Sequence, residues 1–97
     1  MLVLPAELTH GQARACARML KQAIRSEGAT EVVADVSALA HFDSSALAVL
    51  LECRREALVM GKQFSIKAWP ARLRDLAMLY GVAELLSPAP SAAAAAA

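Results

Sequence analysis

Apolar residues recur along the chain with two different periods, one typical of helices and the other of strands. Runs with steps of three and four residues predict three amphipathic helices, at 10–26, 45–60 and 71–80. Short continuous or alternating apolar runs predict strands at 2–4, 31–36 and 63–68, and we expect a last short strand at 82–86. This alternation predicts an α/β fold with a small, mostly parallel sheet of about four strands and about three helices packed against it.

The strand runs differ in how deeply they are expected to be buried. The run from Glu31 to Val36 is β-branched and nearly continuous in apolar character, which predicts a central parallel strand covered on both faces. The run at 2–4 is stopped by Pro5, which cannot donate to a sheet, so we expect an edge position for it. The run at 63–68 alternates, as in a strand near an edge, and its apolar side consists of Phe64, Ile66 and Ala68.

The first predicted helix carries an apolar face and a basic face. Thr9 and Gln12 have the spacing of a capping box, which places the start of the helix directly after Thr9. Its expected core face consists of Ala13, Cys16, Ala17, Leu20 and Ile24. A row of basic residues follows a neighbouring face at helical steps: Arg14, Arg18, Lys21 and Arg25. We expect this row to be either a solvated flank or a docking surface for an acidic partner.

The second predicted helix begins in the sequence Asp43-Ser44-Ser45. Side-chain oxygens of Asp and Ser accept hydrogen bonds from the unpaired amides of a first helical turn. The hydroxyl of Ser44 or Ser45 is therefore expected to lie exposed at a positively polarised helix end, where it could carry or receive a phosphate. The simpler alternative is that Asp43, Ser44 and Ser45 act only as helix-capping residues.

Two apolar stripes run along this second helix. The first consists of Ala46, Val49, Leu50, Cys53, Ala57 and Met60, and the second of Leu47, Leu51 and Leu58. Such width predicts either deep burial or an apolar patch that is kept for a partner. Gly61 and Gly81 are expected to end the second and third helices. The third helix is expected to present four residues to the core, namely Leu73, Leu76, Ala77 and Tyr80.

Composition limits the size and the partners of the protein. The 97 residues are 58% hydrophobic and 20% charged, which predicts one small domain over 1–86 and a disordered Pro/Ser/Ala tail over 87–97. The net charge of +1 implies no bulk attraction to nucleic acid or to an anionic membrane. The first residues lack the pattern of a signal peptide, and no apolar run is long enough to span a bilayer. We expect the protein to reach a membrane only by binding something else.

The sequence offers no set of residues for catalysis or for a cofactor. Cys16 and Cys53 match no metal-binding spacing and are expected to be free, buried thiols of a cytoplasmic protein. Glycine-rich phosphate loops are absent, and the two histidines have no cluster of ligands around them. His41, Asp43 and Ser44 lie in one turn of chain, where a nucleophile relay is hard to build. We predict no catalytic, cofactor-binding or metal-binding residue.

Two segments resemble the STAS domain family of anti-sigma factor antagonists and their relatives. They are Val32-Val33-Ala34-Asp35-Val36-Ser37 and Phe42-Asp43-Ser44-Ser45-Ala46-Leu47, followed by a helix that ends at Gly61 before a strand at 64–68. The likeness covers 2–86. Within the family, the stretches 4–9 and 76–82 resemble the small STAS subunits of bacterial Mla phospholipid transporters. The family's first hairpin strand has no counterpart here, so either the start is truncated or the sheet is one strand smaller.

The resemblance implies a function in binding another protein. It implies a cytoplasmic, non-enzymatic subunit that regulates or stabilises the ATPase of an Mla-type ABC transporter, held with its permease at the inner membrane. The implied contact surface includes Asp43, Ser44, Ser45, Leu47 and Leu51. The alternative is an anti-sigma factor antagonist whose binding is switched by phosphorylation of Ser44, although Ala46 stands where that family usually has glycine.

Overall fold

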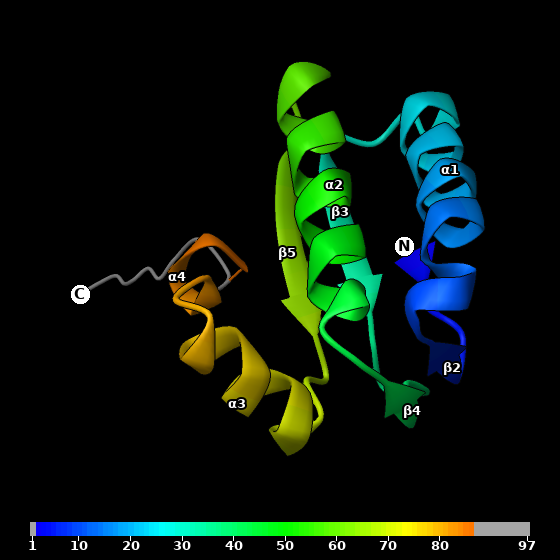
Figure 1. The fold of residues 1–97 in the computed structure, drawn as a ribbon. Helices are drawn as coiled ribbons and strands as arrows, with labels where there is room; N and C mark the ends of the chain where they lie inside the picture. The colour runs from blue at the N-terminus through cyan, green and yellow to red at the C-terminus, as the bar shows by residue number, and fades with distance from the viewer. Residues whose placement is uncertain (1, 87–97) are drawn as a thin grey trace.

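The computed structural model describes residues 2–86, which are organised around two parallel sheets (Figure 1). The larger sheet has the strand order β1–β3–β5, with β1 at Leu2–Val3, β3 at Glu31–Asp35 and β5 at Gln63–Lys67. The predicted central place of β3 and the edge places of β1 and β5 are confirmed. A second sheet pairs β2 (Glu7–Leu8) with β4 (His41–Phe42). It was not predicted, because two residues are too few to show a period.

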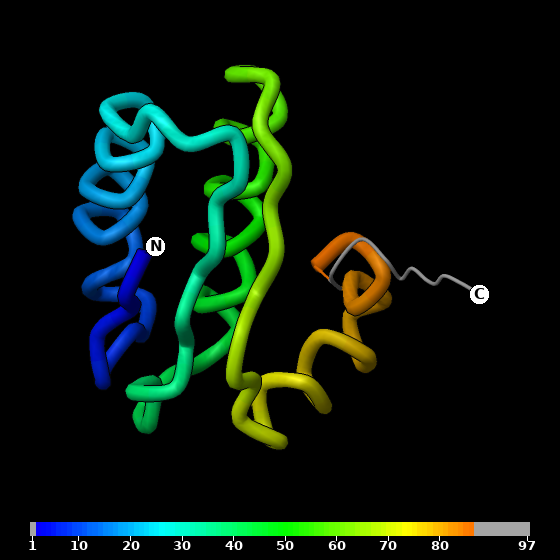
Figure 2. The backbone as a smooth tube through the Cα atoms, turned by 180° about the vertical axis from the view of Figure 1, so that it is seen from behind, coloured from blue at the N-terminus to red at the C-terminus, as the bar shows by residue number. Residues whose placement is uncertain are grey.

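Two long helices cover one face of the larger sheet (Figures 1 and 2). They are α1 (His10–Ser26) and α2 (Ser45–Val59). Val32 and Ala34 of β3 point to this face and are buried, whereas Val33 and Asp35 on the other face are only half-buried. The prediction that β3 is covered on both faces was therefore wrong. The chain runs across the sheet in one direction, from β1 to β3 to β5. Because the connections between parallel strands are right-handed, both connecting helices then lie on the same face of the sheet.

Helix α1 begins with the predicted capping box. The backbone N–H of Thr9 donates to Oε1 of Gln12 at 2.8 Å, and the hydroxyl of Thr9 donates to the same oxygen at 2.6 Å. At the other end, Nζ of Lys62 donates to the carbonyl oxygen of Ile24 at 2.7 Å and also to that of Glu27. A cation at this place is favourable because a helix C-terminus is negatively polarised. The predicted core face is confirmed, with Cys16, Leu20 and Ile24 buried.

Helix α2 is the most deeply buried helix of the fold. Its apolar stripes meet both α1 and the sheet, and it ends before Gly61, whose φ of 73° suits glycine. Leu47 is 3% exposed and belongs to the core, Leu51 is half-buried, and Leu58 is 50% exposed. Its fully enclosed residues are Ala46, Leu47, Val49, Leu50, Cys53 and Ala57. Of the two explanations for its wide apolar surface, burial accounts for most of it.

Two shorter helices lie beside β5 (Figures 1 and 2). Strand β5 ends at Lys67, because Ala68 turns out of the sheet with a φ of 63° and is exposed rather than on the expected apolar side. Helix α3 (Ala71–Leu79) follows Pro70 and stops before Gly81, as predicted. Leu73 and Ala77 are buried and Leu76 is half-buried, but Tyr80 is 56% exposed and does not belong to the core. Tyr80 lies just past the last helical residue, where the helical period no longer fixes its direction.

The predicted strand at 82–86 is a helix, α4 (Ala83–Leu86). After Gly81, the N–H of Val82 donates to the carbonyl of Ala77 at 2.9 Å, which turns the chain directly into the new helix. Leu86 is then fully buried. A short apolar run fits a strand or a helix equally well, and tertiary packing decided here. The predicted tail at 87–97 lies outside the described residues.

Candidate functional site

The candidate site lies where the parallel strands end and the helices begin. Strands β3 and β5 point to the same end of the molecule at which α1, α2 and α3 start (Figure 1). In open parallel sheets, this carboxyl end of the strands is where loops and helix N-termini gather and where ligands most often bind. The residues from Phe42 to Ser45 therefore occupy a favourable part of the fold.

Asp43 joins the starts of two helices with one carboxylate. Its Oδ1 accepts a hydrogen bond from the N–H of Ser45 at 2.8 Å, in the first turn of α2. Its Oδ2 accepts one from the N–H of His10 at 3.1 Å, the first residue of α1. The pKa of Asp43 is lowered, first by the bond from Ser45 and further by the bond from His10. Asp43 is therefore fixed in its charged form between two positively polarised helix ends.

Ser44 is exposed beside this carboxylate. Its φ of −62° and ψ of −16° are already helical, and its carbonyl accepts hydrogen bonds from the N–H groups of Leu47 and Ala48. Because Asp43 caps the helix, the hydroxyl of Ser44 is not used, and it makes no hydrogen bond among the described residues. The expectation of an exposed hydroxyl at this helix start is confirmed for Ser44, whereas Ser45 is half-buried.

An open hollow of about 470 Å³ lies between the start of α2 and the side of α3. Its floor includes Phe42, over whose ring the guanidinium of Arg72 stacks at 4.6 Å from the ring centre. Arg72 also donates through Nη2 to the carbonyl oxygen of Phe42 at 3.2 Å. Polar and apolar side chains line the hollow together, and the lining residues are Phe42, Asp43, Ser44, Arg72, Asp75, Leu76, Leu79 and Tyr80.

Part of the apolar lining of this hollow comes from residues that the sequence did not single out as contacts. Leu79 is 75% exposed and Tyr80 is 56% exposed, and together with the half-buried Leu76 they place apolar surface in one hollow. The sequence marked their segment through Gly81 and through the family likeness at 76–82, but no periodicity could place Leu79 and Tyr80 beside Ser44. Contact between α2 and α3 brings the two segments together.

The predicted contact residues are only partly accessible. Asp43, Ser44 and Ser45 stand together at the start of α2, as expected. Leu47 lies three residues beyond Ser44 and points into the core, so it offers no surface to a partner in this structure. Leu51 is packed against the core and is half-buried. The accessible apolar surface beside Ser44 is that of α3.

In the described part of the chain, few groups could form a metal site, a membrane span or a reactive thiol. No cluster of three His, Cys, Asp or Glu side chains is placed there to hold a metal ion. No helix within 2–86 is both long and apolar enough to cross a bilayer. Cys16 and Cys53 are free and buried, as predicted. Burial raises the pKa of both thiols, that of Cys53 to about 12.

Comparisons with known proteins agree with the fold described above. A family model described as "Mlab, STAS domain" matches residues 1–87. Among solved structures, the chain is similar to the anti-sigma factor antagonist SpoIIAA in its unphosphorylated form, with a TM-score of 0.70 and 20% sequence identity. That match covers 90% of this chain and 76% of SpoIIAA, and at this identity it shows a shared fold alone. Comparison with curated protein sequences finds no match.

Proposed function

The chain belongs to the MlaB-like STAS domain family, and on this premise we propose that it is a non-enzymatic subunit of an Mla-type phospholipid ABC transporter. In this role it binds the cytoplasmic ATPase of the transporter and regulates or stabilises it. The protein then lies at the inner membrane only through the ATPase and its permease. The proposal assigns no catalytic residue, no cofactor and no nucleic-acid partner to the chain.

The observation that carries this proposal is the mostly apolar hollow beside Ser44, which also has polar and charged side chains in its lining. Leu79 and Tyr80 expose apolar surface, and its burial against a partner would make a favourable contribution to the free energy of binding. Asp43 and Ser44 also line the hollow, where they can fix the orientation of a partner through hydrogen bonds. Tyrosine at the centre of such a surface is a frequent source of binding energy. This arrangement is that of a docking surface.

A pair of variants with matched exposure tests the docking surface. Leu79, in the hollow, and Val59, at the far end of α2, are both 75% exposed, so neither substitution should disturb the core. We expect Leu79→Asp to abolish co-purification of the co-expressed ATPase, because a charge in a desolvated interface is strongly unfavourable. Val59→Asp should retain the ATPase. Leu51 is a less suitable position, since it packs against the core and its substitution also tests folding.

The results can distinguish a wrongly placed docking surface from a wrong function. Circular dichroism spectra and melting curves of both variants should match those of the parent protein. A folded Leu79→Asp protein that still brings the ATPase down would show that the hollow is not the docking surface. Failure of the unmodified protein to bind any Mla-type ATPase, in a pull-down from native membranes, would reject the transporter function itself.

A second candidate function rests on the free hydroxyl of Ser44. This hydroxyl is exposed and unbonded, as the target of a protein kinase must be. A phosphate there would add a charge of about −1.5 to −2 beside Leu79 and Tyr80, which would oppose apolar docking. The protein would then act as an anti-sigma factor antagonist whose binding is switched off by phosphorylation.

Intact mass spectrometry after incubation with ATP and a cognate anti-sigma kinase tests this alternative. A single added phosphate that disappears in Ser44→Ala, but persists in Ser45→Ala, would favour the switch. In contrast, the transporter subunit is expected to tolerate Ser44→Ala, or to lose part of its affinity for the ATPase. No phosphate on Ser44 under these conditions would reject the switch.

A further inference from the structure

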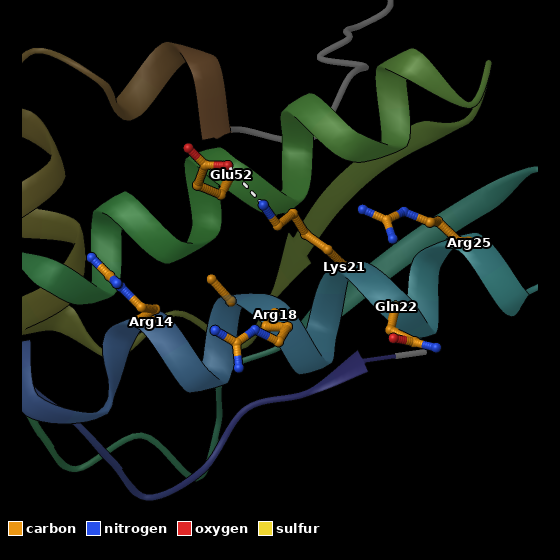
Figure 3. A pocket seen from close by; sticks show the side chains of 7 residues that line it. Arg14, Arg18, Lys21, Gln22, Arg25 and Glu52 are labelled. Carbon is orange, nitrogen blue, oxygen red and sulfur yellow. Dashed lines mark hydrogen bonds and ion pairs between the residues drawn. The ribbon is translucent and has the colours of Figure 1, made fainter.

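A second surface, distinct from the hollow beside Ser44, runs along the seam between α1 and α2 (Figure 3). Two adjoining depressions of about 380 and 340 Å³ form it, and both include Arg14, Ala17 and Glu52 in their lining. None of the residues that line them lines the hollow beside Ser44. We call this surface the α1–α2 groove.

The α1–α2 groove carries more positive than negative charge. Nζ of Lys21 lies 3.4 Å from Oε1 of Glu52, and Nε of Arg25 lies 2.9 Å from Oε2 of Glu56. Figure 3 shows Lys21 reaching across to Glu52, with Arg14 and Arg25 to either side of it along α1. Arg14 makes no ion pair within 2–86. The same is true of Arg18, so two exposed guanidinium groups have no internal acid to neutralise them.

The floor of the groove is apolar and made of small side chains. Ala13 and Ala17 of α1 are half-buried, and Ala48 of α2 is exposed opposite them. Because alanine projects only a methyl group, a bound chain could approach the helices closely and still contact apolar surface. Arg14 and Ala17 line both depressions, so charged and apolar contacts lie side by side where the two adjoin, and the rest of the basic row continues from there.

The shape and length of the groove select the kind of ligand. Arg14 and Arg25 are eleven residues apart in α1, which corresponds to about 16 Å along the helix axis. That length exceeds a single phosphate and equals about five residues of an extended chain. A planar membrane surface could not follow a concave floor between two helices. We propose that the α1–α2 groove binds an acidic segment of a partner polypeptide.

Fluorescence anisotropy with a labelled peptide tests this assignment. The probe is a peptide of alternating Glu and Ala, about twelve residues long, titrated with the full chain at low salt and at about 0.15 M salt. We expect saturable binding that weakens with salt. The double substitution Arg14→Gln with Arg18→Gln should weaken it about fivefold to tenfold, because two exposed charge contacts are lost. A peptide with Gln in place of Glu should not bind.

A charge-matched control separates the groove from the net charge of the protein. Arg55 and Arg74 are exposed and line neither depression, so Arg55→Gln with Arg74→Gln removes the same charge elsewhere. This control should bind the peptide within about twofold of the parent protein. Glutamine is a good helix former, so both double variants should keep the parent melting temperature.

Three results would overturn the assignment. The first is no saturable binding of the Glu/Ala peptide. The second is an equal loss of binding in the two double variants, which would indicate unspecific attraction. The third is groove-dependent binding of phosphatidylglycerol vesicles or of inorganic phosphate without groove-dependent binding of the peptide. Vesicle binding of this kind would assign the groove to anionic lipid, and phosphate binding would assign it to a small anion.

Discussion

Asp43 is the residue on which the candidate site depends. One carboxylate accepts N–H groups from the first turns of both α1 and α2, so a single side chain fixes two helix starts relative to each other. The neighbouring Ser44 hydroxyl is left unused and exposed as a consequence. The sequence predicts that Asp43, Ser44 or Ser45 caps one helix, and the structure assigns the cap to Asp43 and extends it to two.

Substitution of Asp43 should lower stability in proportion to the hydrogen bonds that are lost. We expect Asp43→Ala to lower the melting temperature by about 4 to 8 °C at pH 7, because two helix N-termini lose their acceptor. Asp43→Asn keeps one acceptor oxygen and should cost about half as much. Thermal melts followed by circular dichroism measure both. Equal melting temperatures for all three proteins would contradict this role.

The contribution of Asp43 should also depend on pH. Its pKa in the folded protein is lowered, so its stabilising effect is complete above the ordinary carboxyl pKa of about 3.9 and is lost as the pH falls through the folded value. A protonated carboxyl group offers the helices the same acceptors as an amide. The melting temperatures of the parent protein and of Asp43→Asn should therefore converge as the pH falls through the lowered pKa of Asp43, whereas a constant difference would argue against a charged cap.

The short helix α4 shows how an element can depend on its packing rather than on its sequence. It has only the residues Ala83–Leu86, which is too short for an isolated helix to be stable in water. Contacts with α2, α3 and β5 hold it in place, and Leu86 is its buried anchor. The apolar run at 82–86 fits a strand as well as a helix, and its packing makes it a helix even though β5 beside it is an edge strand.

Two adjacent leucines of α4 should differ sharply in their effect on stability. Leu86 is fully buried, so Leu86→Ala should lower the free energy of unfolding by about 2 to 4 kcal/mol through lost burial and the cavity that remains. Leu85 is 47% exposed, and Leu85→Ala should cost less than about 1 kcal/mol. Urea unfolding curves give both values. Similar losses for the two variants would show that α4 does not pack as described.

At the scale of the whole molecule, the fold is one-sided. Two helices shield one face of the three-stranded sheet, and the core lies between these helices and the strands. The thiols of Cys16 and Cys53 lie in that core, at the packing surfaces of α1 and α2. Access to them requires the two helices to separate, so their reactivity reports the opening of the molecule.

The buried thiols should react slowly while the protein is folded. Thiolates are the reactive form, and a pKa of about 12 leaves Cys53 almost entirely protonated at pH 8. We expect an aromatic disulfide reagent to modify Cys53 in a Cys16→Ala variant at least about a hundredfold faster in urea than in buffer. The raised pKa also predicts that stability falls as the pH rises above the unfolded thiol value of about 8.5. Rapid modification in buffer would contradict this burial.

Local sequence patterns were enough to predict the α/β class, the helices α1, α2 and α3, the central strand, and the helix starts after Thr9 and within 43–45. These features follow from local choices, namely the apolar period, the capping residues and the glycines with positive φ, so a single segment is enough to reveal them. The family likeness could be predicted for the same reason, and the family model that matches residues 1–87 confirms it. An exposed hydroxyl of Ser44 or Ser45 was predicted in the same way, and the structure selects Ser44.

Which segments come into contact depends on tertiary packing and could not be predicted from the sequence. Tertiary packing paired β2 with β4, turned 82–86 into a helix, left one face of the sheet open and buried Leu47. It also set Leu79 and Tyr80 beside Ser44, and joined two cations of α1 to two carboxylates of α2. Each of these outcomes depends on distances between residues far apart in the chain. Periodicity reports the direction of a side chain from its own element, but not the identity of its neighbour.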